Sequence, residues 1–268
     1  MSAPPGPLLL VGPQRSGTTA LGAALSAAVA AAGGCFTVNG KLPYLLRRWW
    51  TPADVAAAHL RADEAAHALA RVPPYGDGAG AWLGRARAAL LAGARRAADG
   101  RAAPTVAEEA RRICAEAYAA EPWGDKYNEY LLDLPWLDAV FPDARWIFLV
   151  RDPAETVASM LAWPRDKPWN PAHAAAASAK WAHWASRWLE FRARVPPERR
   201  CELDYADLCD GRAEGLAELV GVETAPFLTG LRRSAADRPR PPLGPRALDV
   251  RAALARLRIL GEPAGTTR

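Results

Sequence analysis

The residues best suited to chemistry lie in the segment GPQRSGTT, at positions 12 to 19. Gly12 and Gly17 have the spacing of a phosphate-binding loop, but Thr18 stands where such a loop carries its lysine. The cation lies three residues earlier, at Arg15. Because an apolar run precedes the segment and an alanine-rich run follows it, the pattern predicts a loop between a strand and a helix.

Backbone N–H groups at the start of that helix are expected to bind an anion. They belong to residues 16 to 19, which are Ser16, Gly17, Thr18 and Thr19. Glycine at position 17 lets the backbone approach the anion closely, and the helix dipole favours negative charge at the same place.

A second segment, WIFLVRDPAETVASM, ends a predicted strand with Arg151 and continues into a helix that carries Ser159 eight residues later. The planar guanidinium of Arg151 offers a permanently charged, forked donor that suits a phosphate. Ser159 adds a hydroxyl two turns into the helix. Taken alone, the RDP triplet is more typical of a helix cap beside a surface arginine.

Together the two segments resemble sulfotransferases that use 3′-phosphoadenosine 5′-phosphosulfate (PAPS) as co-substrate. The loop with Arg15 resembles their 5′-phosphosulfate loop, and the pair Arg151 and Ser159 resembles their 3′-phosphate motif. The resemblance implies a P-loop NTPase-like sulfotransferase fold. It also implies transfer of a sulfuryl group from PAPS to a hydroxyl or amine, without a metal ion.

Two further segments are similar to this family. In WGDKYNEY, Lys126 matches a lysine that contacts the transferring sulfuryl group. In CELDYADL, Tyr205 matches a tyrosine near the adenine. The alternatives are an ordinary surface lysine and a half-buried core tyrosine. By this resemblance Arg15 and Lys126 stabilise the charge that develops during transfer.

The acceptor must also lose a proton, and related enzymes use a Glu or His soon after the first helix. Residues 20–53 contain no Asp, Glu or His. A helix is predicted over residues 51–72, and we favour Glu64 or His59 on it as the base, although a solvated helix face explains both. Other candidates are Asp54, Asp63, His67, Glu108, Glu109 and Asp125.

Tryptophans are frequent, with 11 in the chain. Those on the helix predicted for residues 172–194 suit core packing. Trp163 and Trp169 flank a loop that could cover the co-substrate or the acceptor. Trp49 and Trp50 are candidates to line the acceptor pocket, which would favour an acceptor with an apolar or aromatic body.

The alternation of strands and helices predicts a single α/β domain, residues 1–268, with a central parallel sheet flanked by helices. Residues 8–32 and 123–230 should form the co-substrate-binding core. Residues 40–122 should form a helical insertion that faces the acceptor, and residues 232–268 a Pro- and Arg-rich tail. Both motif loops leave strands at their carboxyl ends, where such sheets bind ligands.

The composition is that of an ordinary globular protein, with 50% apolar residues and a net charge of +5. The basic residues form no run of five, so no nucleic-acid partner is expected. The four cysteines lack the spacing of a zinc site, and with no secretory signal we expect them to stay reduced. No segment suits a membrane span, and the expected location is the cytoplasm.

The sequence therefore predicts a PAPS-dependent sulfotransferase that acts on a small-molecule, natural-product or carbohydrate acceptor. Three alternatives stay open. They are a P-loop kinase or NTPase, a nucleotide-binding protein without catalysis, and a basic nucleic-acid-binding protein.

Overall fold

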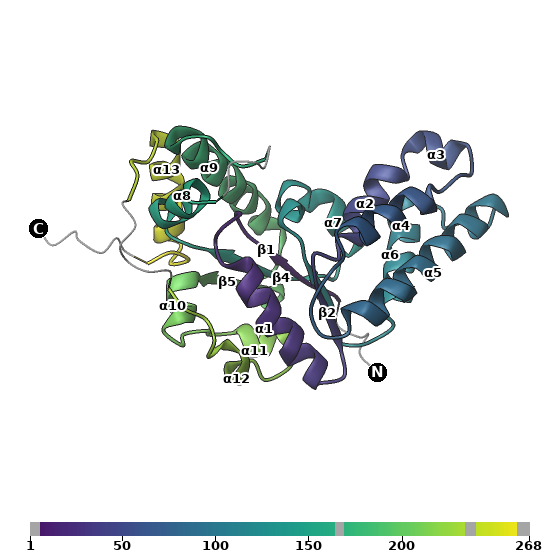
Figure 1. The fold of residues 1–268 in the computed structure, drawn as a ribbon, viewed down its shortest axis with the longest axis horizontal. Coiled ribbons are helices and arrows are strands. Elements are labelled where there is room, and N and C mark those ends of the chain that lie inside the picture. Colours follow the sequence, from purple (N-terminus) through teal and green to yellow (C-terminus); the bar gives the residue numbers. More distant parts are fainter. Residues whose placement is uncertain (1–5, 164–168, 234–239, 262–268) are drawn as a thin grey trace, which may run out of the picture.

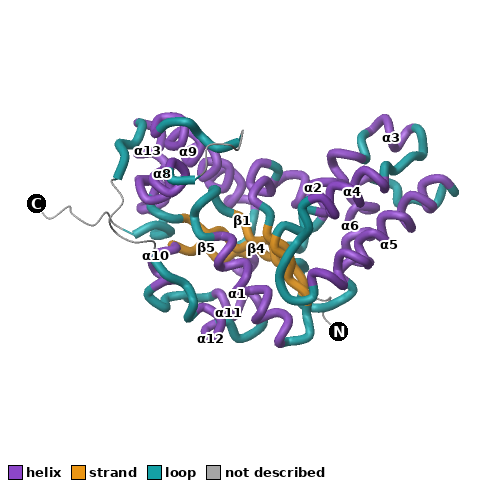
Figure 2. The backbone as a smooth tube through the Cα atoms, in the orientation of Figure 1, coloured by secondary structure: helices purple, strands orange, loops and turns teal. Residues whose placement is uncertain are grey.

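The computed structural model describes residues 6–163, 169–233 and 240–261. Its centre is a sheet of five parallel strands in the order β2-β3-β1-β4-β5, shown in orange in Figure 2. The strands are β1 (Leu8–Val11), β2 (Cys35–Val38), β3 (Trp123–Lys126), β4 (Arg145–Val150) and β5 (Arg200–Asp204). Helices cover both faces of the sheet, which confirms the predicted α/β class (Figure 1).

Alternate residues of β1 explain why both faces are covered. Leu8 and Leu10 belong to one apolar cluster, whereas Leu9 and Val11 belong to a larger cluster on the other face. Helices of the first cluster are α1 (Thr18–Ala31), α10 (Tyr205–Cys209), α11 (Leu216–Val220) and α12 (Ala225–Leu228). The second cluster includes α7 (Leu134–Val140), α9 (Ala174–Phe191) and α13 (Pro245–Arg256), and α8 (Pro153–Leu161) packs against α9.

A group of helices between β2 and β3 extends beyond the β2 edge of the sheet (Figure 1). Its members are α2 (Leu42–Trp49), α3 (Pro52–Ala56), α4 (Ala62–Arg71), α5 (Ala79–Ala98) and α6 (Val106–Tyr118). Short 3-10 helices complete the structure: η1 (Asn128–Leu132), η2 (Arg192–Arg194) and η3 (Pro197–Arg199). None of the helices in the described ranges is long and apolar enough to cross a membrane.

The single helix predicted for residues 51–72 is wrong, because the chain breaks between α3 and α4. The Asp54 carboxylate accepts hydrogen bonds from the backbone and hydroxyl of Thr51, both at 2.7 Å, and pairs with Arg61 at 3.2 Å. These contacts close α3 into a short turn, and Ala58 follows with φ +51°. His59 therefore lies in an exposed linker and shares no helix face with His67.

The carboxylate of Asp125, on β3, connects the elements around the carboxyl ends of β2 and β3. It accepts hydrogen bonds from Thr37 Oγ1 (2.7 Å), Tyr130 OH (2.6 Å) and the backbone N–H groups of Gly40 (2.9 Å) and Lys41 (2.7 Å). Asp125 is 1% exposed. The turn that begins α2 and the segment η1 are thus fixed to the same strand end.

Candidate active site

The loop between β1 and α1 has the backbone of an anion site. Gly17 is the N-cap of α1 with φ +92°, and a Cβ there would lie 2.3 Å from ring atoms of Tyr205. The N–H groups of the first turn have no earlier helical carbonyl to bond. One expectation needs correction, because the N–H of Ser16 donates to the carbonyl oxygen of Pro13 at 3.2 Å. The donors that remain begin at Gly17.

The Ser16 side chain does not reach the cavity either. Its hydroxyl oxygen is buried and has no hydrogen-bond partner within the described residues. Such an orphaned polar atom behind the loop is unusual in a folded protein.

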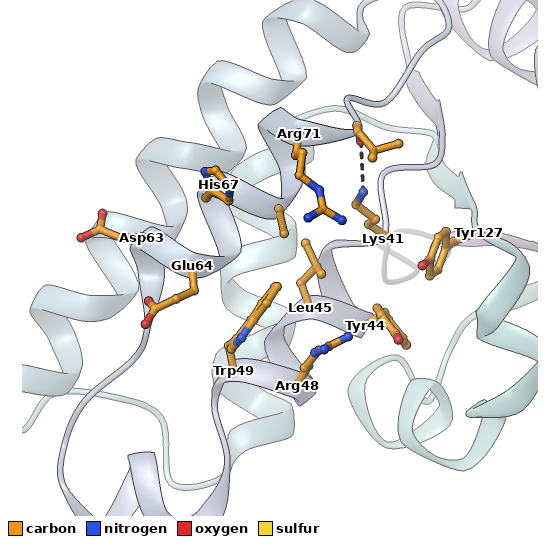
Figure 3. A pocket seen from close by; sticks show the side chains of 12 residues that line it. Lys41, Tyr44, Leu45, Arg48, Trp49, Asp63, Glu64, His67, Arg71 and Tyr127 are labelled. Atoms are coloured by element: carbon orange, nitrogen blue, oxygen red, sulfur yellow. Dashed lines mark hydrogen bonds between the residues drawn. The ribbon is translucent and has the colours of Figure 1, made fainter. Parts of the chain in front are cut away.

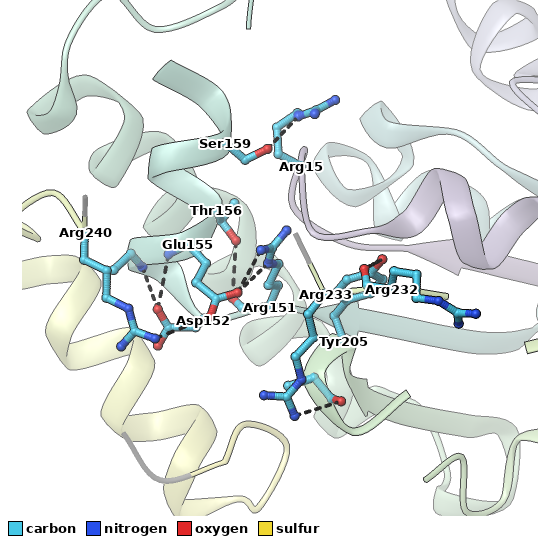
Figure 4. Close-up of polar contacts among 12 residues, drawn as sticks. Arg15, Arg151, Asp152, Glu155, Thr156, Ser159, Tyr205, Arg232, Arg233 and Arg240 are labelled. Carbon is cyan, nitrogen blue, oxygen red and sulfur yellow. Dashed lines mark hydrogen bonds and ion pairs between the residues drawn. The ribbon is translucent and has the colours of Figure 1, made fainter. Parts of the chain in front are cut away.

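Arg15 joins the two sequence motifs. Its Nε donates to Ser159 Oγ at 3.2 Å (Figure 4). Its guanidinium carbon lies 4.0 Å from the ring centroid of Trp163. Arg15 and Ser159 are 144 residues apart in the sequence. The phosphate-binding loop and the helix after β4 therefore meet at one cleft.

Arg151, at the end of β4, is 6% exposed and points into the same region. It makes an ion pair of 2.8 Å with Glu155, one turn into α8, and lies 5.5 Å from the ring centroid of Tyr205 (Figure 4). Asp152 caps α8 by accepting from the N–H groups of Ala154 (2.9 Å) and Glu155 (3.3 Å). The strand end and the helix start are therefore held rigidly around the arginine.

The C-terminal segment also reaches this region. Tyr205 OH donates to the carbonyl oxygen of Arg232 at 3.0 Å, and Arg240 lies 3.5 Å from the Glu155 carboxylate. Arg251, on α13, pairs with Asp152 at 3.3 Å. Residues 234–239 and 262–268 of the predicted tail lie outside the described residues.

A cavity of about 550 Å³, the co-substrate cavity below, collects these side chains. Seven of the eight residues predicted to bind the co-substrate line it, all but Ser16. Its lining is Gln14, Arg15, Gly17, Thr18, Thr19, Ala20, Ala23, Asn128, Arg151, Ser159, Trp163, Trp169 and Tyr205. Trp163 and Trp169 thus face the cavity, whereas residues 164–168 of the loop between them lie outside the described residues.

Lys126 lies beside the loop because β3 pairs with β1 in the register Leu10 to Lys126. Its Nζ donates to Thr19 Oγ1 at 3.3 Å, and the side chain is buried. Burial lowers the pKa of Lys126 to about 8, against the opposing charges of Asp125 and Glu129. Lys126 is thus a desolvated cation at the edge of the co-substrate cavity.

A second cavity of about 560 Å³, the α2–α4 pocket, lies between α2, α4 and Tyr127 (Figure 3). It is lined by Lys41, Tyr44, Leu45, Arg48, Trp49, Asp63, Glu64, His67, Ala68, Arg71, Val72 and Tyr127. Glu64 and Trp49 were both predicted near the acceptor, and they line this pocket. His59 and Trp50 do not, since His59 lies in the linker and Trp50 is buried.

Three other carboxylates considered as the base have structural contacts. Asp125 accepts the four hydrogen bonds described above. Glu109 is buried, with an oxygen 2.5 Å from an Arg96 nitrogen, and it accepts from the N–H of Ala103 at 2.8 Å. Glu108 forms a capping box with Thr105 at the start of α6.

Sequence reasoning missed several polar residues around the two cavities. Asn128 Oδ1 accepts from Thr18 Oγ1 at 3.5 Å, which links η1 to the loop. Lys180 Nζ donates to Gln14 Oε1 at 2.6 Å. Glu129 is half-buried, and burial raises the pKa of the neighbouring Tyr127, with the Glu129 charge adding to the shift. The sequence signal that could have identified Asn128 and Glu129 is their position two and three residues after Lys126.

Metal binding has no support in the described part of the chain, where no group of three or more His, Cys, Asp or Glu side chains could hold an ion. The co-substrate cavity itself is lined by two arginines and, among the described residues, by no carboxylate. This charge distribution suits an anionic ligand held by protein groups.

Comparison with known proteins supplies an independent result. A family model described as "Sulfotransferase family" matches residues 7–223. The sulfotransferase domain of the olefin synthase from Synechococcus PCC 7002 has 17% identity and a TM-score of 0.61, covering 95% of this chain and 96% of that chain. A sulfotransferase domain from the curacin biosynthetic pathway has 14% identity and a TM-score of 0.53, covering 95% and 99%. No curated protein matches the chain.

Gly78 is a matched control for the close approach between Gly17 and the Tyr205 ring. Both glycines are helix N-caps with positive φ, +92° and +76°, but a Cβ at Gly78 meets nothing within 4 Å. Gly17→Ala adds a clash with Tyr205 to the shared backbone strain. It should therefore lower the free energy of unfolding by about 1–3 kcal/mol more than Gly78→Ala, as measured by urea denaturation. Equal losses would contradict the contact.

Proposed function

The chain belongs to the sulfotransferase family, and we propose that it transfers a sulfuryl group from PAPS to a hydroxyl or amine of a small-molecule, natural-product or carbohydrate acceptor. The observation that carries the proposal is the convergence of Arg15, Arg151 and Ser159 on the co-substrate cavity, with Lys126 at its edge. Lys126 ends β3, Arg15 and Arg151 follow the neighbouring strands β1 and β4, and Ser159 lies on α8.

The residues present suit a ligand with two separated anionic groups. The start of α1 offers backbone N–H donors and Gly17 leaves room for close approach, which fits the 5′-phosphosulfate end. Arg151 and Ser159 offer a charged fork and a hydroxyl, which fit the 3′-phosphate. Tyr205, fixed by its hydrogen bond to Arg232, lies between these two regions as a support for the adenosine.

PAPS, when bound, supplies an activated sulfuryl group on its 5′-phosphate. The acceptor oxygen forms a bond to sulfur, and the bond from sulfur to the phosphate oxygen breaks with its electron pair on the leaving adenosine 3′,5′-bisphosphate. Arg15 and Lys126 stabilise the negative charge that develops there, and donors aimed at such charge lower barriers by about 3–4 kcal/mol each.

The acceptor proton passes to a base, for which we propose Glu129. This carboxylate follows Lys126 by three residues, and its charge acts on Lys126, Lys41 and Tyr127. It therefore lies close to Lys41 and Tyr127 of the α2–α4 pocket and to Lys126, which contacts Thr19 of the co-substrate cavity. Glu64, which the sequence favoured, is exposed on α4 across the pocket from Tyr127 (Figure 3).

A kinase or NTPase is the alternative that shares most of this geometry. It would need a lysine at position 18, where this chain has Thr18, and a carboxylate to bind magnesium. Within the described residues no carboxylate lines the co-substrate cavity. ATP with magnesium is therefore the ligand to compare.

Arg151 should distinguish nucleotides by their 3′-phosphate. Arg151→Ala is expected to weaken binding of adenosine 3′,5′-bisphosphate by about 10- to 100-fold, because a charged hydrogen bond contributes about 1.5–3 kcal/mol. Binding of AMP should change less than threefold. Isothermal titration calorimetry measures both, and Arg251→Ala is the control because Arg251 pairs with Asp152 outside the cavity.

Either of two outcomes would overturn the assignment. Equal losses for the bisphosphate and AMP would remove Arg151 from the 3′-phosphate site. Tight binding of ATP–magnesium, with none of the bisphosphate, would make the loop that of a kinase.

Lys126 should set the alkaline limit of activity. Its ammonium group must be charged to stabilise the transferring group, and its pKa is about 8. We expect kcat/KM for PAPS, with 2-naphthol as acceptor, to fall as pH rises above about 8, since this parameter reports the free enzyme. In Lys126→Arg the fall should disappear up to pH 9.5, because arginine stays charged. An unchanged alkaline fall would contradict the role.

The two candidate bases can be separated in the same assay. Glu129→Gln should lower kcat by about a hundredfold or more, since a positioned base contributes 10²- to 10⁴-fold. Binding of adenosine 3′,5′-bisphosphate should stay unchanged. Glu64→Gln, which also removes one charge beside the acceptor, should change kcat less than threefold. The reverse order of effects would return the role to Glu64.

A further inference from the structure

The α2–α4 pocket combines cations with aromatic rings in a way that predicts a class of acceptor. We infer that this pocket binds acceptors with a flat apolar or aromatic body and an anionic group, such as a carboxylate, sulfate or phosphate. The inference rests on the proposed sulfotransferase function, because it places the acceptor beside Tyr127, the residue after Lys126.

Three cations line the pocket, and two of them lie close enough to repel each other. Burial lowers the pKa of Lys41, and the charge of Arg71 lowers it further, although Asp125 and Glu129 oppose the shift. In Figure 3 the Lys41 ammonium and the Arg71 guanidinium lie on the same side of the pocket. An anion between them would relieve the repulsion.

The backbone fixes Lys41 in place. It is 7% exposed, has φ +49°, and its N–H donates to the buried Asp125 carboxylate at 2.7 Å. Its Nζ donates to the carbonyl oxygen of Val72 at 3.0 Å, which uses one of three ammonium donors. A cation held this way keeps donors for a ligand.

The exposed arginines of the pocket lack acidic partners. Within the described residues no hydrogen bond or ion pair joins Arg48 or Arg71 to a carboxylate. The adjacent Arg47, outside the pocket, pairs instead with Asp133. The two carboxylates of the lining, Asp63 and Glu64, lie on α4 across the pocket from Lys41 (Figure 3).

Aromatic side chains define the body of the ligand. Tyr44 and Tyr127 lie with ring centroids 5.1 Å apart, and the Arg48 guanidinium lies 5.4 Å from the ring centroid of Trp49. The volume of about 560 Å³ is that of a small-molecule site. A flat ring system can pack on Trp49 while its anionic group reaches Arg48 or Arg71.

Matched acid and amide probes test the inference without knowledge of the natural acceptor. The pairs are 6-hydroxy-2-naphthoate and 4-hydroxyphenylacetate, each with its neutral amide. Calorimetry with the bisphosphate already bound should show at least one acid that binds tenfold or more tightly than its amide, which is the effect of a charge-assisted hydrogen bond. At least one of the substitutions Arg71→Ala and Arg48→Ala should reduce that ratio to threefold or less.

Arg95→Ala is the control, because Arg95 is exposed on α5 outside the pocket. It should leave the ratio unchanged. The inference is overturned if no acid outperforms its amide, or if the preference survives both arginine substitutions. If the wild-type protein does not bind the bisphosphate, the proposed function itself is refuted, so the two failures are distinguishable.

Discussion

The carboxylate of Asp125 accepts four hydrogen bonds while almost wholly removed from water. Burial raises its pKa, although every one of those donors opposes the shift. A buried carboxylate is tolerated only when its lone pairs are satisfied in this way. Because the donors come from β2, the turn before α2 and η1, one charge fixes the position of all three. The walls of the α2–α4 pocket and the segment after Lys126 both depend on it.

Neighbouring residues of β3 point to opposite faces of the sheet and so have different roles. Asp125 is paired with Leu9 and points to the helical group, whereas Lys126 is paired with Leu10 and points to Thr19 on α1. A pKa lowered from 10.5 to about 8 corresponds to about 3 kcal/mol against the charged form. The folded state releases this proton before the unfolded state does, so the contribution of Lys126 to stability rises from about pH 8 to 10.5. An anionic ligand beside Thr19 would stabilise the charged form of Lys126 and so offset this free-energy cost. Ligand binding and protonation of Lys126 would therefore favour each other.

Apolar runs predict β1 and most of β4, since a strand buried on both faces favours an unbroken apolar sequence, whereas β3 (WGDK) and β5 (RCELD) carry charged residues. Helix α2 was not predicted, although Pro43 near its start and leucines at 42, 45 and 46 were signals. The break after α3 contains Ala58 with φ +51° and is spanned by the ion pair between Asp54 and Arg61, which periodicity does not reveal. Glu129 is harder to identify, because two lysines whose pKa its charge raises, Lys41 and Lys180, lie far from it in the sequence and only the fold brings them near.

The motif residues of the co-substrate cavity hold one another before any ligand binds. Glu155 orients the Arg151 guanidinium through an ion pair of 2.8 Å. The Tyr205 ring lies below Arg151 and occupies the space that a Cβ at Gly17 would fill. Arg15 is oriented by Ser159 and by the Trp163 ring. Loop, strand end and helix are thus one packed unit, and a ligand meeting preoriented side chains loses less conformational entropy than one that must order them. The sequence requirement for glycine at position 17 therefore comes from the tyrosine 188 residues later as much as from the anion itself.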